Sequence, residues 1–222
     1  MPAPATEPEV LMVHLYGFTD ESDLGPMSRA VCEEIVRVAH KYKWIILLGG
    51  WHDRTKKSRP TSAEIAYAWL VSRGISPQKL VTQFTIGGIA ATKMPARNTS
   101  EEVDLAGQIL LHLFPGEDPK SIPFPAIGLW FHRLRIWMLW LSRHANYCGF
   151  VSASSPQTRL FAKGMLLRVM QEPPGWLLTL ADPYGQRWFF RKLNFERTHI
   201  METDEQWSCN SHHVWKDLRW PE

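Results

Sequence analysis

The sequence has few cysteines, no long hydrophobic run and no strong excess of charge of either sign. Its three cysteines, Cys32, Cys148 and Cys209, are odd in number and widely spaced, which favours reduced thiols over a disulfide framework. No charge-free apolar run of about 18 residues occurs, so no transmembrane helix is expected. The first nine residues lack the pattern of a signal peptide. These absences predict a cytoplasmic protein.

The charge balance also argues against a nucleic-acid partner. The formal net charge is +3 at pH 7, which is too small to indicate binding to a polyanion. Hydrophobic residues make up 45% and charged residues 21% of the chain, as in ordinary globular proteins with a buried core. A chain of 222 residues is at the upper end of the single-domain range, so one domain spanning 1–222 is expected, with a core at about 10–182.

Short apolar runs alternate with segments of helical periodicity. The runs predict strands at Val10–Tyr16, Trp44–Leu48, Lys79–Phe84, Tyr147–Ala153 and Trp176–Ala181. The periodic segments predict helices at about Met27–Tyr42, from Thr61 or Ser62 to Gly74, from Asn98 or Thr99 to Leu113, at Leu129–His144 and at Pro156–Met170. The proline-rich stretch Phe114–Pro125 is expected to be a connector.

This alternation predicts right-handed crossovers and a parallel sheet. The expected fold is a Rossmann-like three-layer α/β sandwich of about five strands in the order 3-2-1-4-5. A Trp-rich helical insertion at about 114–145 and a C-terminal extension at 183–222 complete the chain. Ligands in such sheets bind beyond the carboxyl ends of the strands, where the strand order switches sides. The loops after Tyr16, Leu48 and Val151 are therefore expected to converge.

Three short motifs follow or border these strand ends. Gly49-Gly50 allows close approach of the backbone to an anion, or else a tight turn without a ligand. Arg97-Asn98-Thr99 opens a helix, where the helix dipole favours anions and where Asn98 or Thr99 can also serve as a simple cap.

The third motif combines hydroxyl groups with a cation. Ser152 lies near the end of the predicted strand at 147–153, Ser154 follows that strand, and Arg159 lies on the next helix. They can hold a phosphate or a ribose-like hydroxyl, or they can form an ordinary helix start with Pro156. No base for a serine nucleophile is evident, so binding is favoured over covalent catalysis. The predicted ligand contacts are Gly49, Gly50, Arg97, Asn98, Thr99, Ser152, Ser154 and Arg159.

The order of these motifs resembles the SanA/ElyC/YdcF family, also called domain of unknown function 218, over about residues 10–182. The matching segments are Ile45–Gly50, Thr61–Glu64, Gly74–Leu80, Arg97–Glu102 and Ser152–Arg159. The resemblance implies the same fold and a link to cell-envelope metabolism. The chain departs from the family at Gln83, Glu102 and Pro156, which stand where an acid, an Asn and a His are usual. These departures favour binding over catalysis.

Two functions remain open. The first is a small-molecule-binding protein for a nucleotide-like or other anionic ligand, and it includes an enzyme of unassigned class. The second is a non-catalytic binding or scaffold protein that uses its Trp-rich segments for protein or membrane-surface contacts. The sequence identifies neither a catalytic residue nor a cofactor. Cys209, His212 and His213 lack a fourth ligand at a suitable spacing, so no metal site is predicted.

The segment Leu129–His144 interleaves tryptophans with arginines and histidines. Apolar residues nearly surround the predicted helix, which favours packing between the sheet and the Trp-rich tail. Contact with a protein partner or a second copy is the next alternative, and binding at a membrane interface is the third.

Overall fold

A five-stranded parallel sheet in the order β3-β2-β1-β4-β5 forms the centre of the protein. The computed structural model describes residues 8–15, 24–49, 61–82, 99–143, 146–154, 169–170 and 172–181. The strands are β1 (Val10–His14), β2 (Trp44–Leu48), β3 (Leu80–Thr82), β4 (Phe124–Leu129) and β5 (Tyr147–Ala153). The predicted Rossmann-like α/β class and the predicted strand order are confirmed.

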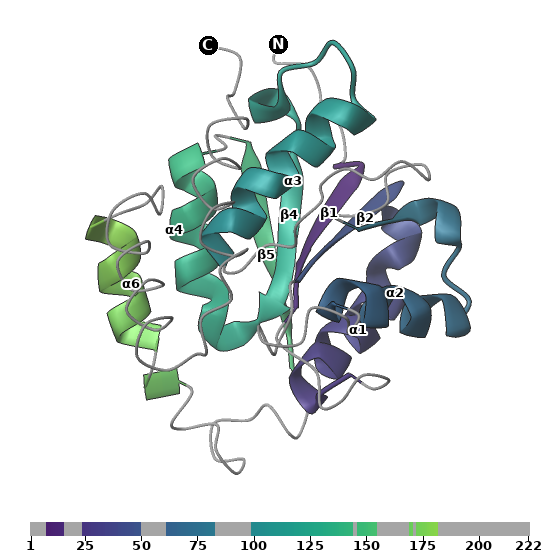
Figure 1. Ribbon diagram of the computed structural model, residues 1–222, viewed down its shortest axis with the longest axis horizontal. Helices are drawn as coiled ribbons and strands as arrows, with labels where there is room; N and C mark the ends of the chain where they lie inside the picture. The colour runs from purple at the N-terminus through teal and green to yellow at the C-terminus, as the bar shows by residue number, and fades with distance from the viewer. Residues whose placement is uncertain are drawn as a thin grey trace, which may run out of the picture.

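Helices cover both faces of the sheet, as Figure 1 shows. On one face lie α1 (Pro26–Val38) and α2 (Ser62–Ser72), and on the other lie α3 (Thr99–Leu113) and α4 (Arg133–Arg143). A further helix, α6 (Glu172–Ala181), packs against the outer side of α4. Short 3₁₀ turns are η1 (Ala39–Lys41), η2 (Pro77–Lys79), η3 (Pro119–Ser121) and η4 (Trp130–His132). In the ranges described, no helix is long and apolar enough to cross a membrane.

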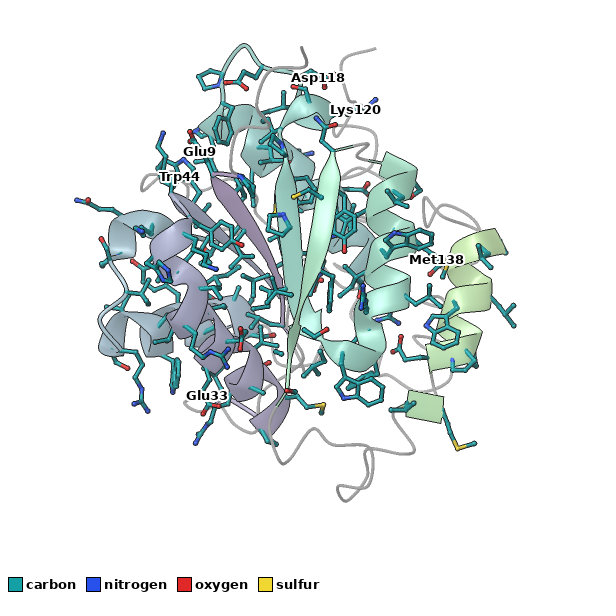
Figure 2. All side chains as sticks on the ribbon, turned by 180° about the vertical axis from the view of Figure 1, so that it is seen from behind. Glu9, Glu33, Trp44, Asp118, Lys120 and Met138 are labelled. Carbon is teal, nitrogen blue, oxygen red and sulfur yellow. The ribbon has the colours of Figure 1, made fainter. Side chains whose placement is uncertain are left out.

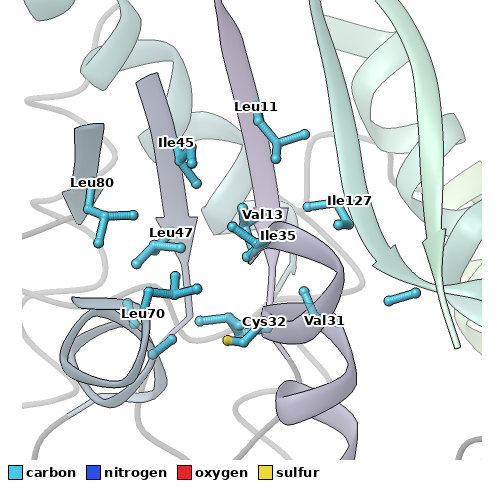
Figure 3. Close-up of a cluster of buried hydrophobic side chains, with 14 of the residues drawn as sticks. Leu11, Val13, Val31, Cys32, Ile35, Ile45, Leu47, Leu70, Leu80 and Ile127 are labelled. Atoms are coloured by element: carbon cyan, nitrogen blue, oxygen red, sulfur yellow. The ribbon is translucent and has the colours of Figure 1, made fainter. Parts of the chain in front are cut away.

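The core consists of two layers because successive strand residues point to opposite faces. Leu11 and Val13 of β1 pack with Val31 and Ile35 of α1 on one face (Figure 3). Val10 and Met12 pack on the other face, against α3 and α4. The same alternation places His14, the last residue of β1, on the face of α3 and α4.

Local signals set the ends of α2 as predicted. Thr61 is the N-cap: its hydroxyl oxygen accepts a hydrogen bond from the backbone N–H of Glu64 at 3.2 Å. The Glu64 carboxylate in turn accepts from the backbone N–H of Thr61 at 2.7 Å, which completes a capping box. Just beyond the helix, Gly74 adopts a φ of +87°, a conformation in which glycine avoids the steric cost of a side chain.

The strand β4 is a correction, because its residues were expected to be the end of a connector and the start of a helix. Pro123 and Pro125 argued against a strand, since proline cannot donate to the ladder. The structure accommodates Pro125 in two ways. The register with β5 shifts between Phe124 and Pro125, and pairing with β1 begins only at Ala126. The segment 114–145, expected to be an insertion, therefore supplies a strand between β1 and β5.

Two other assignments change with it. The helix expected from Leu129 begins instead at Arg133, since Leu129 ends β4 and η4 follows. Trp176–Ala181, expected to be the fifth strand, belongs to α6, and the strand expected to be fourth is β5. A short apolar run does not distinguish a strand from a helix, and Pro173 and Pro174 suit a helical first turn. Of the helix expected at Pro156–Met170, only the helical Val169 and Met170 are among the described residues.

Candidate functional site

The switch in strand order lies between β1 and β4, so the carboxyl ends of these strands frame the expected site. They are His14 and Leu129, and the latter leads into η4. Glu9, Trp44, Asp118 and Lys120 mark the opposite end of the sheet in Figure 2. The loops whose convergence was predicted, after Tyr16, Leu48 and Val151, lie at 16–23, 50–60 and 155–168, outside the described residues.

A buried hydrogen-bonded group joins β1 to α3 and α4 at this edge. His14 Nδ1 lies 2.8 Å from Oε2 of Glu102 in α3. Trp140 of α4 donates its indole N–H to His14 Nε2 at 3.0 Å. His14 and Glu102 are only 5% and 7% exposed, and Trp140 is fully buried. Gly128 of β4 leaves room beside this group, since a Cβ there would lie 3.6 Å from His14 Cβ and 3.2 Å from Ile136 Cδ1.

These contacts determine which nitrogen of His14 carries the proton. The indole N–H can only donate, so His14 Nε2 must accept. The proton of the neutral ring is therefore on Nδ1, where it is donated to the Glu102 carboxylate. Because both ring nitrogens are engaged, His14 serves to join the three elements and is not available as an acid or base in this arrangement.

A second buried group joins η4, α4 and α6 to the start of α3. Glu172, the first residue of α6, places Oε1 3.1 Å from His132 Nδ1 and Oε2 3.8 Å from Arg135 Nε. Arg135 Nη2 donates to the hydroxyl of Thr99, the first residue of α3, at 3.2 Å. Gly175 lets α6 approach closely, since a Cβ there would lie 3.2 Å from Arg135 Nη1. This group ties the outer helix to the edge of the sheet where ligands are expected.

The proton between His132 and Glu172 belongs on His132 Nδ1. Arg135 Nη2 also lies 3.3 Å from that nitrogen, but the carboxylate is nearer and carries the charge that a donor prefers. Burial is the main cause that lowers the pKa of His132 below its ordinary 6.5, and the charge of Arg135 lowers it further, against the opposing effect of Glu172. Burial alone would raise the pKa of Glu172. The hydrogen bond from His132 and the charges of His132 and Arg135 nevertheless leave it below its ordinary 4.5.

Both shifts predict that the protein loses stability in acid. Below pH 6.5 the unfolded chain protonates His132 while the folded protein resists, and below 4.5 the same holds for Glu172. Because the unfolded state then binds more protons, the free energy of unfolding falls with pH, by at most about 1.4 kcal/mol per pH unit for one group. We expect the free energy of unfolding of His132→Gln to fall less steeply than that of the wild type just below pH 6.5. Urea unfolding across this pH range measures it.

The control for this prediction is His40→Gln, which removes an exposed imidazole at η1, outside both groups. Its stability profile should follow that of the wild type. A flattening equal to that of His132→Gln, or an unchanged decline in His132→Gln, would contradict the assignment of the acid sensitivity to His132.

Four of the predicted ligand contacts lie among the described residues. Thr99 stands at the start of α3 and meets Arg135. Gly49 is buried at the end of β2, where a Cβ would lie 3.2 Å from both Leu15 Cβ and Ser62 Cβ, so the absence of a side chain already serves the packing of α2. Ser152 and Ser154 are exposed at the end of β5. Gly50, Arg97, Asn98 and Arg159 lie outside the described residues, and their role in binding stays a prediction.

The strand order separates two of these contacts. Gly49 follows β2 and Ser152 lies in β5, with β1 and β4 between them. Three strand spacings amount to about 14 Å. The expected neighbour of β1 was the strand that contains Ser152, but the actual neighbour is β4. Only a ligand that crosses the ends of β1 and β4 could contact both Gly49 and Ser152.

Sequence reasoning missed the two buried groups. His14 carried a usable signal, since it is the polar end of an otherwise apolar strand at the edge where ligands bind. No comparable signal marked His132, Arg135 or Glu172. The first two lay in a segment expected to be one long helix, and Glu172 lay just before a segment expected to be a strand. Within the described part of the chain, no three His, Cys, Asp or Glu side chains are grouped to hold a metal ion.

Comparison with known proteins adds no relative to this description. No protein-family model, no curated protein and no solved structure matches the chain.

Proposed function

We propose that the protein binds a nucleotide-like or other anionic small molecule at the carboxyl ends of its parallel strands, beside the switch point between β1 and β4. The observation that carries this proposal is the meeting of Arg135 with Thr99 at the start of α3. A helix start presents backbone N–H groups and the positive end of the helix dipole. Here it borders the strand ends where α/β sheets bind their ligands.

The contacts of Arg135 bear on the choice of the residue that would hold the anion. In the described part of this edge, the guanidinium of Arg135 lies 3.8 Å from the carboxylate of Glu172, and the carboxylate of Glu102 is hydrogen-bonded to His14. Arg135 is thus already engaged by a carboxylate and by the hydroxyl of Thr99. Arg97 precedes Thr99 by two residues, which limits their separation to about 7 Å. Arg97 is therefore the residue we assign to the anion, as the motif Arg97-Asn98-Thr99 predicts.

The contacts of Glu102 favour binding rather than a reaction. Glu102 stands where the resembling family has Asn, and its carboxylate is used to hold His14. His14 in turn is closed off by Trp140. His132 has the carboxylate partner typical of an acid or base, so an enzyme of unassigned class stays within the proposal. The resemblance in motif order supports a small-molecule site and assigns no reaction.

A thermal-shift screen tests this proposal with nucleotides, adenosyl cofactors and sugar phosphates on the wild type and on Arg97→Ala. A ligand at a hundred times its Kd adds about 2.7 kcal/mol of stability, or roughly 5–10 °C in Tm for a chain of this size. We expect that shift in the wild type and a clearly smaller one in Arg97→Ala.

The matched control is Arg73→Ala, which removes an exposed arginine just beyond α2, where its guanidinium lies 4.8 Å from the ring centre of Trp69. It should respond like the wild type. An equal shift in Arg97→Ala would place the ligand elsewhere. If none of these compounds stabilises the wild type, the proposed ligand class is wrong.

A further inference from the structure

Among the residues that the structure describes, most of the exposed large apolar side chains lie on or beside α4 and α6. Seven large hydrophobic residues are exposed in the described part of the chain, and only Val36 of α1 lies apart from the others. The other six lie on α4, on α6 and just before α6. They are Leu134, Trp137, Leu141, Met170, Leu177 and Leu180, with exposed fractions from 42% to 69%. We call this surface the α4–α6 face.

A groove borders the α4–α6 face, between η4, the first turns of α4 and α6. Its volume is about 470 Å³, and its walls include Trp130, Trp137 and Trp176. Large apolar side chains left in water forgo about 25 cal/mol of burial for each exposed Å². An apolar occupant is therefore expected there.

We propose that the chain's own residues 182–222 cover the α4–α6 face and insert aromatic side chains into its groove. The segment starts directly after Ala181, the last residue of α6, and so at the border of the face (Figure 1). Its 41 residues include four tryptophans and three phenylalanines, the first of them in the run Trp188-Phe189-Phe190. It therefore has both the position and the side chains to cover this surface.

The length of the chain allows this arrangement. The ten residues of α6 extend over about 15 Å. Trp188 follows Ala181 by seven residues, which reach at most about 25 Å when extended. The aromatic run can thus return along the whole of α6. The covalent connection also supplies an effective concentration in the millimolar range, which favours this segment over a second copy at micromolar concentration.

Hydrogen exchange of the full chain, followed by mass spectrometry, tests this inference. The variant Trp137→Glu with Leu177→Glu places two charges on the α4–α6 face. We expect amides in residues 183–200 to be protected in the wild type and to exchange at least tenfold faster in this variant. Val36→Glu, which charges the exposed apolar residue of α1, should leave them protected. Peptides from β1 and β2 must keep their protection in each variant, which shows that the core is folded.

A second variant changes the covering segment instead of the face, so that the test does not depend on charges placed on the α4–α6 face. Trp188→Ala with Phe189→Ala and Phe190→Ala should expose the groove, so that amides of α6 exchange faster and binding of anilinonaphthalene sulfonate increases. Unprotected amides throughout 183–222 in the wild type would overturn the inference. Equal protection in the wild type and in the Trp137→Glu, Leu177→Glu variant would also overturn it.

Two further measurements distinguish the other occupants. Light scattering should give the monomer mass at low and high micromolar concentration, and a dimer that the face variant dissociates would assign the face to a second copy. Flotation with phosphatidylcholine–phosphatidylserine vesicles should leave the protein unbound. Flotation that the face variant abolishes would assign the face to a lipid surface. The inference does not depend on the proposed ligand site, because none of these measurements uses a ligand.

Discussion

Replacement of His14 by leucine should lower the free energy of unfolding by about 3–5 kcal/mol, because the buried carboxylate of Glu102 loses its hydrogen-bond donor. The imidazole lies 2.8 Å from the Glu102 carboxylate, and both residues are buried. Leucine fills much of the space but gives neither a donor for Glu102 nor an acceptor for Trp140. Urea unfolding near neutral pH, monitored by circular dichroism, measures the loss.

A double-mutant cycle shows whether the pair is the cause. The second single variant is Glu102→Leu, which leaves the His14 Nδ1–H without its acceptor and should cost about 1–3 kcal/mol. His14→Leu together with Glu102→Leu removes both polar partners, so it should be less destabilising than His14→Leu alone. If the double variant lost the sum of the two single losses, the two side chains would not be coupled, and the assignment of the buried pair would fail.

Replacement of Trp140 by alanine should be about as damaging, with a loss of about 3–5 kcal/mol. The side chain is fully buried on the face of the sheet covered by α3 and α4. Its ring meets Phe124 edge to face at 4.5 Å between centroids, and its indole N–H binds His14. Alanine removes all of these contacts and leaves a large cavity between α4 and β4. The same urea unfolding measures it.

Trp140→Phe separates packing from hydrogen bonding at this position. Phenylalanine retains an aromatic ring against Phe124 but leaves His14 Nε2 without the indole donor. The expected cost is about 1–3 kcal/mol, clearly less than for alanine. If phenylalanine and alanine cost the same, the indole hydrogen bond would account for the whole effect, and the packing role of Trp140 would be refuted.

Much of the fold could be predicted because its signals are local. The continuous apolarity of Trp44–Leu48 identified β2 with its observed bounds, and a sheet covered on both faces followed from it. Thr61 and Glu64 are three residues apart, and their reciprocal capping bonds depend on no other part of the chain. The left-handed position of Gly74 likewise needs only glycine. Alternation of such elements was sufficient for the parallel sheet and its order.

Local sequence patterns did not identify two of the strands correctly. Pro125 lies in β4 only because the neighbouring ladders tolerate it, through a register shift with β5 and a later start of pairing with β1. The apolar run at Trp176 forms a helix because it packs on α4 outside the sheet, where Leu177 and Leu180 are exposed. Both outcomes depend on what the segment meets in the folded protein.

The sequence by itself determined the class of fold, the strand order and the edge at which a ligand is expected, because periodicity, caps and crossover handedness act over a few residues or over one connection. Only the tertiary structure decided which side chains lie together at that edge. His14 meets Glu102 across 88 positions and Trp140 across 126, and Arg135 meets Thr99 across 36. A hydrogen-bond partner so distant in the chain is chosen by the packing of whole elements, and no local pattern records that choice.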